Sequence, residues 1–158
     1  MTGVQTCALP IYQTAELAKK LGAHHYIDST ATDPAKALEA LGGATVILIT
    51  ASGGKTVAGT FHGLRPGGVS IVLGVGPEPI EINGMDLIFA TRKVDGALTG
   101  TPTVGDITLR FSSLSGVSAM IETVPLEQAP DAYARMMAGK ARFRMVLVTK
   151  NGAAASAR

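Results

Sequence analysis

The sequence predicts an α/β protein built around a parallel sheet, and two observations carry this prediction. Strand-like apolar runs alternate with helix-like segments along most of the 158-residue chain, and this alternation is typical of βαβ units. The composition agrees, since 46% of the residues are hydrophobic, only 4% are aromatic, and Gly occurs 19 times. Small aliphatic residues with many turns favour a sheet flanked by helices over an aromatic-rich sandwich or a helical bundle.

The first part of the chain carries local signals for helices and strands in turn. Apolar residues at helical spacing stop at Gly22, and Asp33 before Pro34 is typical of a helix N-cap followed by proline in the first turn. The uninterrupted aliphatic run at 45–50 is typical of a strand buried on both faces of a parallel sheet. The elements expected here are a helix over 13–21, a strand at 25–28, a helix from Pro34 to Leu41 and a strand over 45–50.

The same alternation continues beyond the turn at 51–54, and the pattern changes near the end of the chain. We expect a helix over 55–64, a turn at 65–68, a strand over 69–74, a short helix at 85–90, a strand over 93–99 and a helix from Thr103 to Leu114. The last stretch predicts a strand at 120–124, a helix over 126–138 and a strand at 144–148. The small-residue tail at 151–158 has no core pattern, and we expect it to be flexible.

Charge, cysteine content and hydropathy exclude several classes of protein. The formal charge is only +2 and the basic residues are scattered, so no dense basic face for nucleic acid is expected. Cys7 is the sole cysteine, which allows no internal disulfide and fits a reducing compartment. No apolar run reaches the ~18–20 residues of a membrane span, and the first charge is Glu16, so the basic start of a secretory signal is missing. These features predict a soluble cytoplasmic protein without a nucleic-acid or membrane partner.

The N-terminal segment does not match the rest of the chain. Residues 2–11 read TGVQTCALPI, with neither helical nor strand periodicity. This segment resembles the translation of a common sequencing-library adapter joined in frame to a gene fragment, which would make residues 1–12 a scar without biological function. The alternative is an irregular arm that ends at the turn signal Leu9-Pro10.

Two motifs that suggest catalysis or metal binding are weak. The stretch Ser52-Gly53-Gly54-Lys55-Thr56 follows a strand and precedes a helix, but Ile49 stands where a phosphate-binding loop needs its first glycine. The pair His24-His25 has no further ligand at metal-site spacing, and neighbours on a strand point to opposite faces. We interpret both histidines as structural, and His62 as a partly exposed residue near a helix C-cap.

A stronger functional signal lies where three expected strands end. The strand ends carry small or flexible residues: Thr50-Ala51-Ser52, Leu73-Gly74-Val75-Gly76 and Ala97-Leu98-Thr99-Gly100. Ligands of open parallel sheets bind at the carboxyl ends of the strands. Small residues there would let a flat ligand such as a nicotinamide lie against backbone amides and carbonyls. Ordinary glycine turns explain the pattern equally well, so both interpretations stay open at this point.

Four segments together resemble the medium-chain dehydrogenases, specifically the zinc-dependent alcohol dehydrogenases. They are AELAKKLGAHHYIDS at 15–29, LRPGGVSIVLGV at 64–75, GALTGT at 96–101 and AYARMMAGKARFRMVLV at 132–148. The resemblance implies a C-terminal fragment, with a truncated Rossmann cofactor domain at 13–116 that keeps strands three to six of its parallel sheet. It also implies that 117–150 is the return segment of a GroES-like catalytic domain.

The resemblance also implies a set of cofactor-binding positions. Backbone atoms at two strand ends would face the nicotinamide, a third strand end would border the cofactor, and one arginine would contact the pyrophosphate. The strand ends that would face the nicotinamide are Leu73, Gly74 and Val75 and, on the second strand, Ala97, Leu98 and Thr99. The strand end that would border the cofactor is Thr50, Ala51 and Ser52, and the arginine is Arg144. No catalytic and no metal-binding residue is implied, because the family's glycine motif and zinc ligands have no match in this sequence.

The family's activity is reversible hydride transfer between an alcohol and NAD or NADP, with zinc in the intact parent. The parent would act on a small alcohol or aldehyde and form a homo-oligomer through the strand near 93–100. We expect the fragment itself to be poorly folded and inactive, because strand three would have no partner and one edge of strand four would be bare. The alternatives are a zinc-free quinone reductase of the same superfamily and a non-catalytic binding module with half a Rossmann fold.

Overall fold

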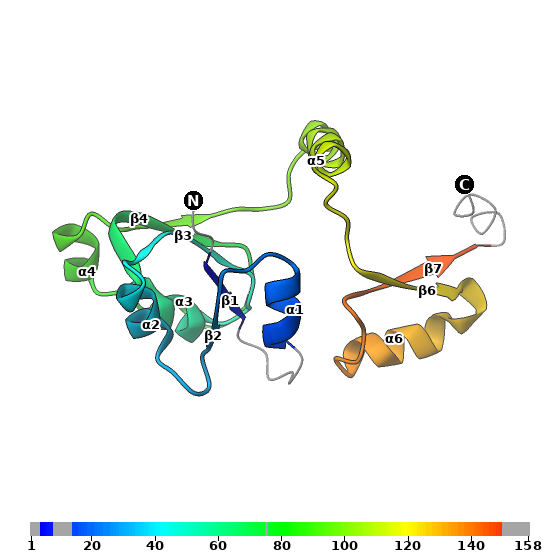
Figure 1. Cartoon of the computed structure of the whole chain (residues 1–158), viewed down its shortest axis with the longest axis horizontal. Coiled ribbons are helices and arrows are strands. Elements are labelled where there is room, and N and C mark those ends of the chain that lie inside the picture. Colours follow the sequence, from blue (N-terminus) through cyan, green and yellow to red (C-terminus); the bar gives the residue numbers. More distant parts are fainter. Residues whose placement is uncertain (1–3, 8–13, 75, 150–158) are drawn as a thin grey trace. The chain divides into compact units, whose positions relative to one another are not determined.

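The computed structural model describes residues 4–7, 14–74 and 76–149. The chain forms two compact units, Met1–Thr99 and Gly100–Arg158 (Figure 1). None of the helices among the described residues combines the length and apolar character that crossing a membrane requires. The adapter scar and the C-terminal tail lie largely or wholly outside the described residues, and the domain boundaries at 12, 116 and 150 stay a prediction.

The chain begins with a βαβ unit that the sequence did not predict. Strand β1 (Val4–Cys7) precedes helix α1 (Thr14–Lys20) and strand β2 (His25–Asp28), and the two strands pair in parallel (Figure 1). Val4–Cys7 form a strand although residues 2–11 show no strand periodicity, and the expectation that the strand at 25–28 has no partner is wrong. The physical reason is that strand pairing uses backbone groups, which an extended segment of almost any sequence can supply.

The main sheet of the first unit has three parallel strands in the order β3-β4-β5. They are β3 (Ala44–Ile49), β4 (Leu64–Val72) and β5 (Lys93–Gly96), and the helices between and before them are α2 (Pro34–Ala40), α3 (Gly54–Phe61) and α4 (Gly84–Phe89). The predicted α/β class with a parallel sheet is confirmed. Among the described residues β3 lies at the edge of this sheet, as expected for its bare side.

Several element bounds differ from the sequence prediction. Helix α3 ends at Phe61 and β4 already starts at Leu64, because the expected turn at 65–68 is an irregularity inside the strand. Leu64 pairs with Ala44, and the next pair joins Val69 to Val46, so four residues of β4 bulge opposite a single residue of β3. Strand β4 ends at Val72 and β5 at Gly96, each two or three residues earlier than predicted.

The core of the first unit lies on one face of the main sheet. Helices α2 and α3 cover this face, and the buried cluster contains Ile27, Leu38, Ile47, Ile49, Val57, Phe61 and Leu64. On the other face of β3, Val46 is 49% and Leu48 63% exposed. The prediction that β3 is buried on both faces is therefore wrong for this chain, because its helices cover only one of them.

Two polar side chains of the first unit differ in whether they have hydrogen-bond partners. Asp33 caps α2 as predicted, since its carboxylate accepts hydrogen bonds from the backbone N–H of Ala35 at 2.9 Å and of Lys36 at 3.3 Å. Ser70 on β4 is fully buried, and among the described residues its hydroxyl has no hydrogen-bond partner. The core thus contains one polar group whose desolvation is uncompensated within the described chain.

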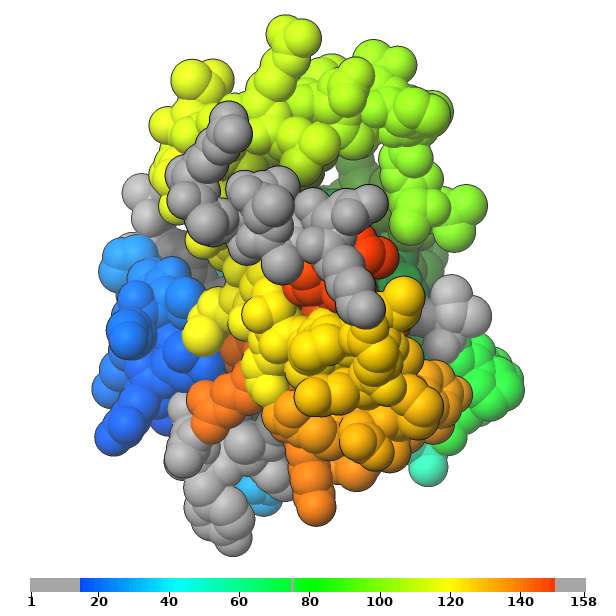
Figure 2. Space-filling model, turned by 90° about the vertical axis from the view of Figure 1, so that its right-hand side faces the viewer, coloured from blue at the N-terminus to red at the C-terminus, as the bar shows by residue number. Residues whose placement is uncertain are grey.

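The second unit is built from a two-stranded parallel sheet and helices. Its elements are α5 (Pro102–Ser115), β6 (Ile121–Pro125), a 3-10 turn (Leu126–Gln128), α6 (Ala129–Met137) and β7 (Arg144–Val148). Ala132 is its one buried hydrophobic residue among those described. The side chains of α5, yellow-green in Figure 2, are largely exposed, with Leu114 at 89%. Strand and helix bounds lie within one to three residues of the prediction.

Candidate functional site

Backbone hydrogen bonds join the carboxyl ends of the three strands in the main sheet. Beyond the last ladder pairs, the N–H groups of Leu73 and Gly74 both donate to the carbonyl of Ile49, at 2.9 and 3.1 Å. The N–H of Ala97 donates to the carbonyl of Val72 at 3.0 Å. The three strand ends that the sequence singled out therefore form one continuous edge.

The turn after β3 and the loop after β4 touch backbone to backbone at two glycines. A Cβ atom on Gly74 would overlap the carbonyl of Ala51, and one on Gly76 would overlap the carbonyl of Ser52. These two positions therefore admit only glycine without a backbone shift. At these two points the turn and the loop therefore meet through backbone atoms, with no side chain between them.

A small pocket of about 230 Å³ lies beside this contact. It is lined by Ala51, Gly53, Gly54, Val57, Val72, Gly74, Gly76, Glu78 and Ile80. Its volume falls below the ~300–1,000 Å³ of typical ligand pockets, so it can hold part of a dinucleotide but not the whole. The strand-end pattern in the sequence included Gly76, but neither Gly76 nor Gly54 was among the predicted cofactor-binding positions. The signal that could have found them is the Gly-x-Gly spacing after β4 and the Pro77-x-Pro79 loop that follows it.

The structure places most of the predicted cofactor-binding residues at or next to this edge. Ala51 and Gly74 line the pocket, Thr50 and Ser52 are exposed beside it, and Leu73 is 44% exposed. The three residues after β5 are also exposed: Ala97, Leu98 and Thr99. Val75 lies outside the described residues. Arg144 is exposed at the start of β7, in the second unit.

A larger pocket of about 520 Å³ lies elsewhere in the first unit, among α1, β2 and α2. Its lining includes Lys19, His24 and His25. The pocket runs along β2 from His25 to Ile27 and is not lined by Asp28 at the carboxyl end of this strand, whereas ligands of parallel α/β sheets bind at the carboxyl ends. We therefore assign the candidate site to the smaller pocket and its edge, despite the difference in volume.

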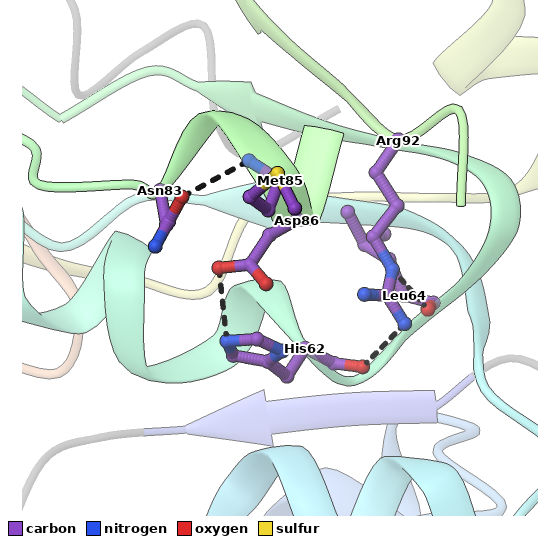
Figure 3. Close-up of polar contacts among 6 residues, drawn as sticks. All are labelled: His62, Leu64, Asn83, Met85, Asp86 and Arg92. Carbon is purple, nitrogen blue, oxygen red and sulfur yellow. Dashed lines mark hydrogen bonds and ion pairs between the residues drawn. The ribbon is translucent and has the colours of Figure 1, made fainter. Parts of the chain in front are cut away.

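Polar contacts hold the segment between β4 and β5 against α3 (Figure 3). His62, the C-cap residue of α3, is exposed as predicted, and its Nε2 lies 3.4 Å from the carboxylate of Asp86 on α4. Arg92 donates from Nε to the carbonyl of Leu64 at 2.8 Å and from a terminal nitrogen to the carbonyl of His62 at 3.1 Å. Asn83 caps α4 by accepting from the N–H of Met85 at 3.0 Å. The contacts of Asp86 and Arg92 thus anchor the segment that precedes β5 to the end of α3 and the start of β4.

The residues at the edge fit a nicotinamide ring better than they fit a metal ion. The exposed residues after β5, Leu98 and Thr99, carry peptide N–H and C=O groups of the kind that hydrogen-bond a carboxamide. Among the described residues, no three His, Cys, Asp or Glu side chains are grouped so that they could hold a metal ion. We therefore derive no metal-dependent step from this chain.

The chain is similar in sequence and fold to known dehydrogenases. Residues 10–115 match the family model of the zinc-binding dehydrogenases. Alcohol dehydrogenase patD of Penicillium expansum is 35% identical over 132 residues, which are 84% of this chain and 38% of that protein. An alcohol dehydrogenase of Geobacillus stearothermophilus is 31% identical over 133 residues, 84% of this chain and 40% of that protein. The chain thus spans about two fifths of the length of these relatives.

Solved structures agree with this assignment. The alcohol dehydrogenase of the archaeon Aeropyrum pernix superposes with a TM-score of 0.77 at 25% identity, over 93% of this chain and 42% of that chain. Benzyl alcohol dehydrogenase of Acinetobacter calcoaceticus gives a TM-score of 0.80 at 18% identity, over 92% and 43% of the two chains, and shows a shared fold. The parallel sheet, the joined strand ends and the matching residues lead to one conclusion: the chain belongs to the zinc-binding dehydrogenase family.

Proposed function

We propose that this chain supplies the nicotinamide-facing strand ends of an NAD(P)-dependent alcohol dehydrogenase. The observation that carries the proposal is the glycine contact at the sheet edge, where Gly74 and Gly76 lie against the carbonyls of Ala51 and Ser52. The relatives named alcohol dehydrogenases support the reaction class. When bound, NAD(P) supplies a hydride acceptor and donor, so that an alcohol and an aldehyde or ketone interconvert.

The role of this chain's residues is to bind and orient the ring. Backbone groups at Leu73, Gly74 and Val75 and at Ala97, Leu98 and Thr99 would hydrogen-bond the carboxamide and fix which ring face meets the substrate. Thr50, Ala51 and Ser52 would border the same ring. Correct orientation of the reacting carbon contributes to the rate because it removes the entropic cost of alignment.

Further features of the proposal concern the longer protein. Arg144 would contact the pyrophosphate, whose charge suits a guanidinium. The zinc ligands would come from other parts of the protein, the substrate would be a small alcohol or aldehyde, and the location would be cytoplasmic. Self-association would use the strand near 93–100, where β5 is exposed along its whole length. We also propose that this chain alone is inactive.

A chimeric enzyme tests the proposal. Residues 14–149 replace the matching region of the Geobacillus stearothermophilus alcohol dehydrogenase, and alcohol oxidation is followed by NADH or NADPH absorbance. We expect measurable oxidation of a primary or secondary alcohol and binding of the reduced cofactor. A cooperatively folded chimera that neither binds the cofactor nor oxidises alcohols would refute the proposal.

A matched pair of glycine substitutions locates the site within the chimera. Gly74→Ala forces a Cβ against the carbonyl of Ala51 and should lower kcat/KM at least tenfold. Gly59→Ala adds the same methyl group to α3, where it meets no atom within 4 Å, and should leave kcat/KM unchanged. Equal effects of the two substitutions would remove the glycine contact as the basis of the proposal.

A further inference from the structure

The segment between β4 and β5 contains an asparagine–glycine pair whose chemistry the proposed function does not use. Asn83 and Gly84 are both exposed, and a Cβ atom added to Gly84 would meet no atom within 4 Å. Ile82 on one side of the pair and Leu87 on the other pack against the buried cluster. The pair is therefore open to water, while the chain on both sides of it is anchored.

The two groups that would react with each other are the backbone nitrogen of Gly84 and the side-chain amide carbon of Asn83. Glycine hinders the approach of its own nitrogen least, because it has no Cβ and a permissive backbone. Gly84 is the first residue of α4, so its N–H takes no part in the hydrogen bonds within the helix. Oδ1 of Asn83 accepts from the N–H of Met85 at 3.0 Å (Figure 3), and this donor can stabilise the negative charge that develops on Oδ1 when Cγ is attacked.

We propose that Asn83 is a site of spontaneous deamidation in the folded chain, with water as the only co-reactant. The Gly84 nitrogen loses its proton and forms a bond to Cγ of Asn83, while the bond from Cγ to Nδ2 breaks. Ammonia leaves, and a succinimide ring closes. Water then opens this ring at Cγ to give aspartate, or at the backbone carbonyl to give isoaspartate, and no group is oxidised or reduced. The proposal does not rest on the proposed enzymatic function.

The two products should differ in their effect on α4. The N–H of Met85 donates to Oδ1 of Asn83 and the N–H of Asp86 to its backbone carbonyl, both at 3.0 Å. Aspartate keeps both acceptors in place. In isoaspartate the chain runs through Cγ, so the backbone is longer and the two carbonyl groups exchange roles. Because Asp86 also lies 3.4 Å from Nε2 of His62, isoaspartate should loosen the contact of α4 with the end of α3.

Incubation of the full chain at neutral and mildly alkaline pH tests the proposal, with tryptic peptides followed by mass spectrometry. The two asparagines of the chain, Asn83 and Asn151, are both followed by glycine, and cleavage after Arg92 and Lys150 places them in different peptides. We expect Asn83 to react within about tenfold of its rate in a synthetic peptide of residues 78–89, because a helix cap restrains the side chain by no more than that. The rate should rise with pH, because the attacking nitrogen must lose its proton.

A matched pair of alanine substitutions tests the role of Gly84. Gly84→Ala should slow deamidation of Asn83 about tenfold, because the methyl group obstructs the approach of the nitrogen and restricts the backbone. Gly59→Ala adds the same methyl group to α3 in equally open space and should keep the original rate. The proposal is overturned if Gly84→Ala reacts as fast as the original chain. It is also overturned if Asn83 in the folded chain reacts more than about a hundredfold more slowly than in the peptide.

Amide hydrogen exchange over α4 tests the structural consequence. The aged chain is compared with a fresh Asn83→Asp chain, which carries the same charge but no isoaspartate, and both contain Asn151→Asp so that the second pair contributes no difference. The isoaspartate fraction of the aged chain should exchange about tenfold faster at Met85 and Asp86, whereas Asn83→Asp should match the fresh original chain. Equal protection of α4 in the isoaspartate and aspartate forms would contradict the loosening of α4.

Discussion

Each of the two compact units of this chain is stabilised internally by a different kind of interaction. The first unit buries a continuous cluster of seven apolar side chains between its sheet and the helices α2 and α3. The second unit buries Ala132 alone among its described hydrophobic residues. Its polar contacts centre on Glu122 of β6, whose carboxylate accepts hydrogen bonds from the Arg135 side chain on α6 and, at 2.7 Å, from the N–H of Arg142 before β7.

This difference shows that two units with similar numbers of apolar side chains need not bury them to the same extent. Side chains such as Phe111 on α5, at 65% exposure, and Leu48 on β3, at 63%, are as apolar as those in the cluster. They stay exposed because no element of their own unit covers them. Burial in the first unit stabilises by roughly 25 cal/mol per Å² of apolar surface, whereas ion pairs near water contribute little and depend on pH and salt. The two units should therefore respond differently to substitution and to acid.

The largest effect should come from the centre of the buried cluster. Phe61 is 1% exposed, and Phe61→Ala removes most of its packing, so we expect the first unit to lose about 3–5 kcal/mol of stability. Denaturant unfolding followed by hydrogen exchange reads each unit separately, and protection in the second unit should be unchanged. Leu48→Ala on the open face is the matched control and should cost no more than about 0.5 kcal/mol. Comparable losses from the two substitutions would disprove the contrast between covered and open faces.

The next effect concerns Ser70, a buried polar residue of the same unit, and has the opposite sign. Ser70→Ala removes a buried hydroxyl without a partner among the described residues, and we expect a gain of about 1 kcal/mol in the free energy of unfolding. Thr60 supplies the comparison, since its buried hydroxyl donates to the carbonyl of Thr56 at 3.0 Å. Thr60→Val should not stabilise the protein. A loss of stability with Ser70→Ala would show that the hydroxyl has a partner that the described residues do not include.

Local signals in the sequence predicted much of the fold, and signals that depend on distant partners did not. The cap at Asp33 and the alternation of strands with helices follow from neighbouring residues, so both predictions were confirmed. The open face of β3 could not be predicted, because aliphatic residues on both faces say nothing about whether a second helix layer is present. The contact of Gly76 with Ser52 joins two loops that only the folded sheet brings together. For the same reason the small residues at the strand ends were identified, but their mutual packing was not.

A smaller effect should follow from loss of the cap in the first unit. Asp33→Ala leaves the N–H groups of Ala35 and Lys36 without their acceptor and should cost about 1 kcal/mol. Asp33→Asn keeps an oxygen in the same place and should restore most of the stability. Equal losses in Asp33→Ala and Asp33→Asn would mean that the negative charge at the helix start, and not the hydrogen bonds, is what stabilises α2.

The smallest effect, and the one specific to the second unit, is its response to acid. The hydrogen bond from the Arg135 side chain, followed by that from the backbone N–H of Arg142, lowers the pKa of Glu122 below its ordinary value. A carboxyl group whose pKa is lowered on folding adds stability that is present above the unfolded-state pKa and is lost as the pH falls through the folded-state pKa. The second unit should therefore weaken in that acidic window, as measured by its thermal midpoint against pH.

Glu122→Gln removes the titrating group, so the thermal midpoint of the second unit should fall less steeply with acid than in the original chain. Glu127→Gln removes an equal charge from the neighbouring 3-10 turn and serves as the matched control, with the original pH dependence retained. A pH profile of Glu122→Gln that coincides with that of the original chain would show that the hydrogen bonds of Glu122 with Arg135 and Arg142 do not stabilise the unit. In that case the pairing of β6 with β7 would rest on its backbone hydrogen bonds alone.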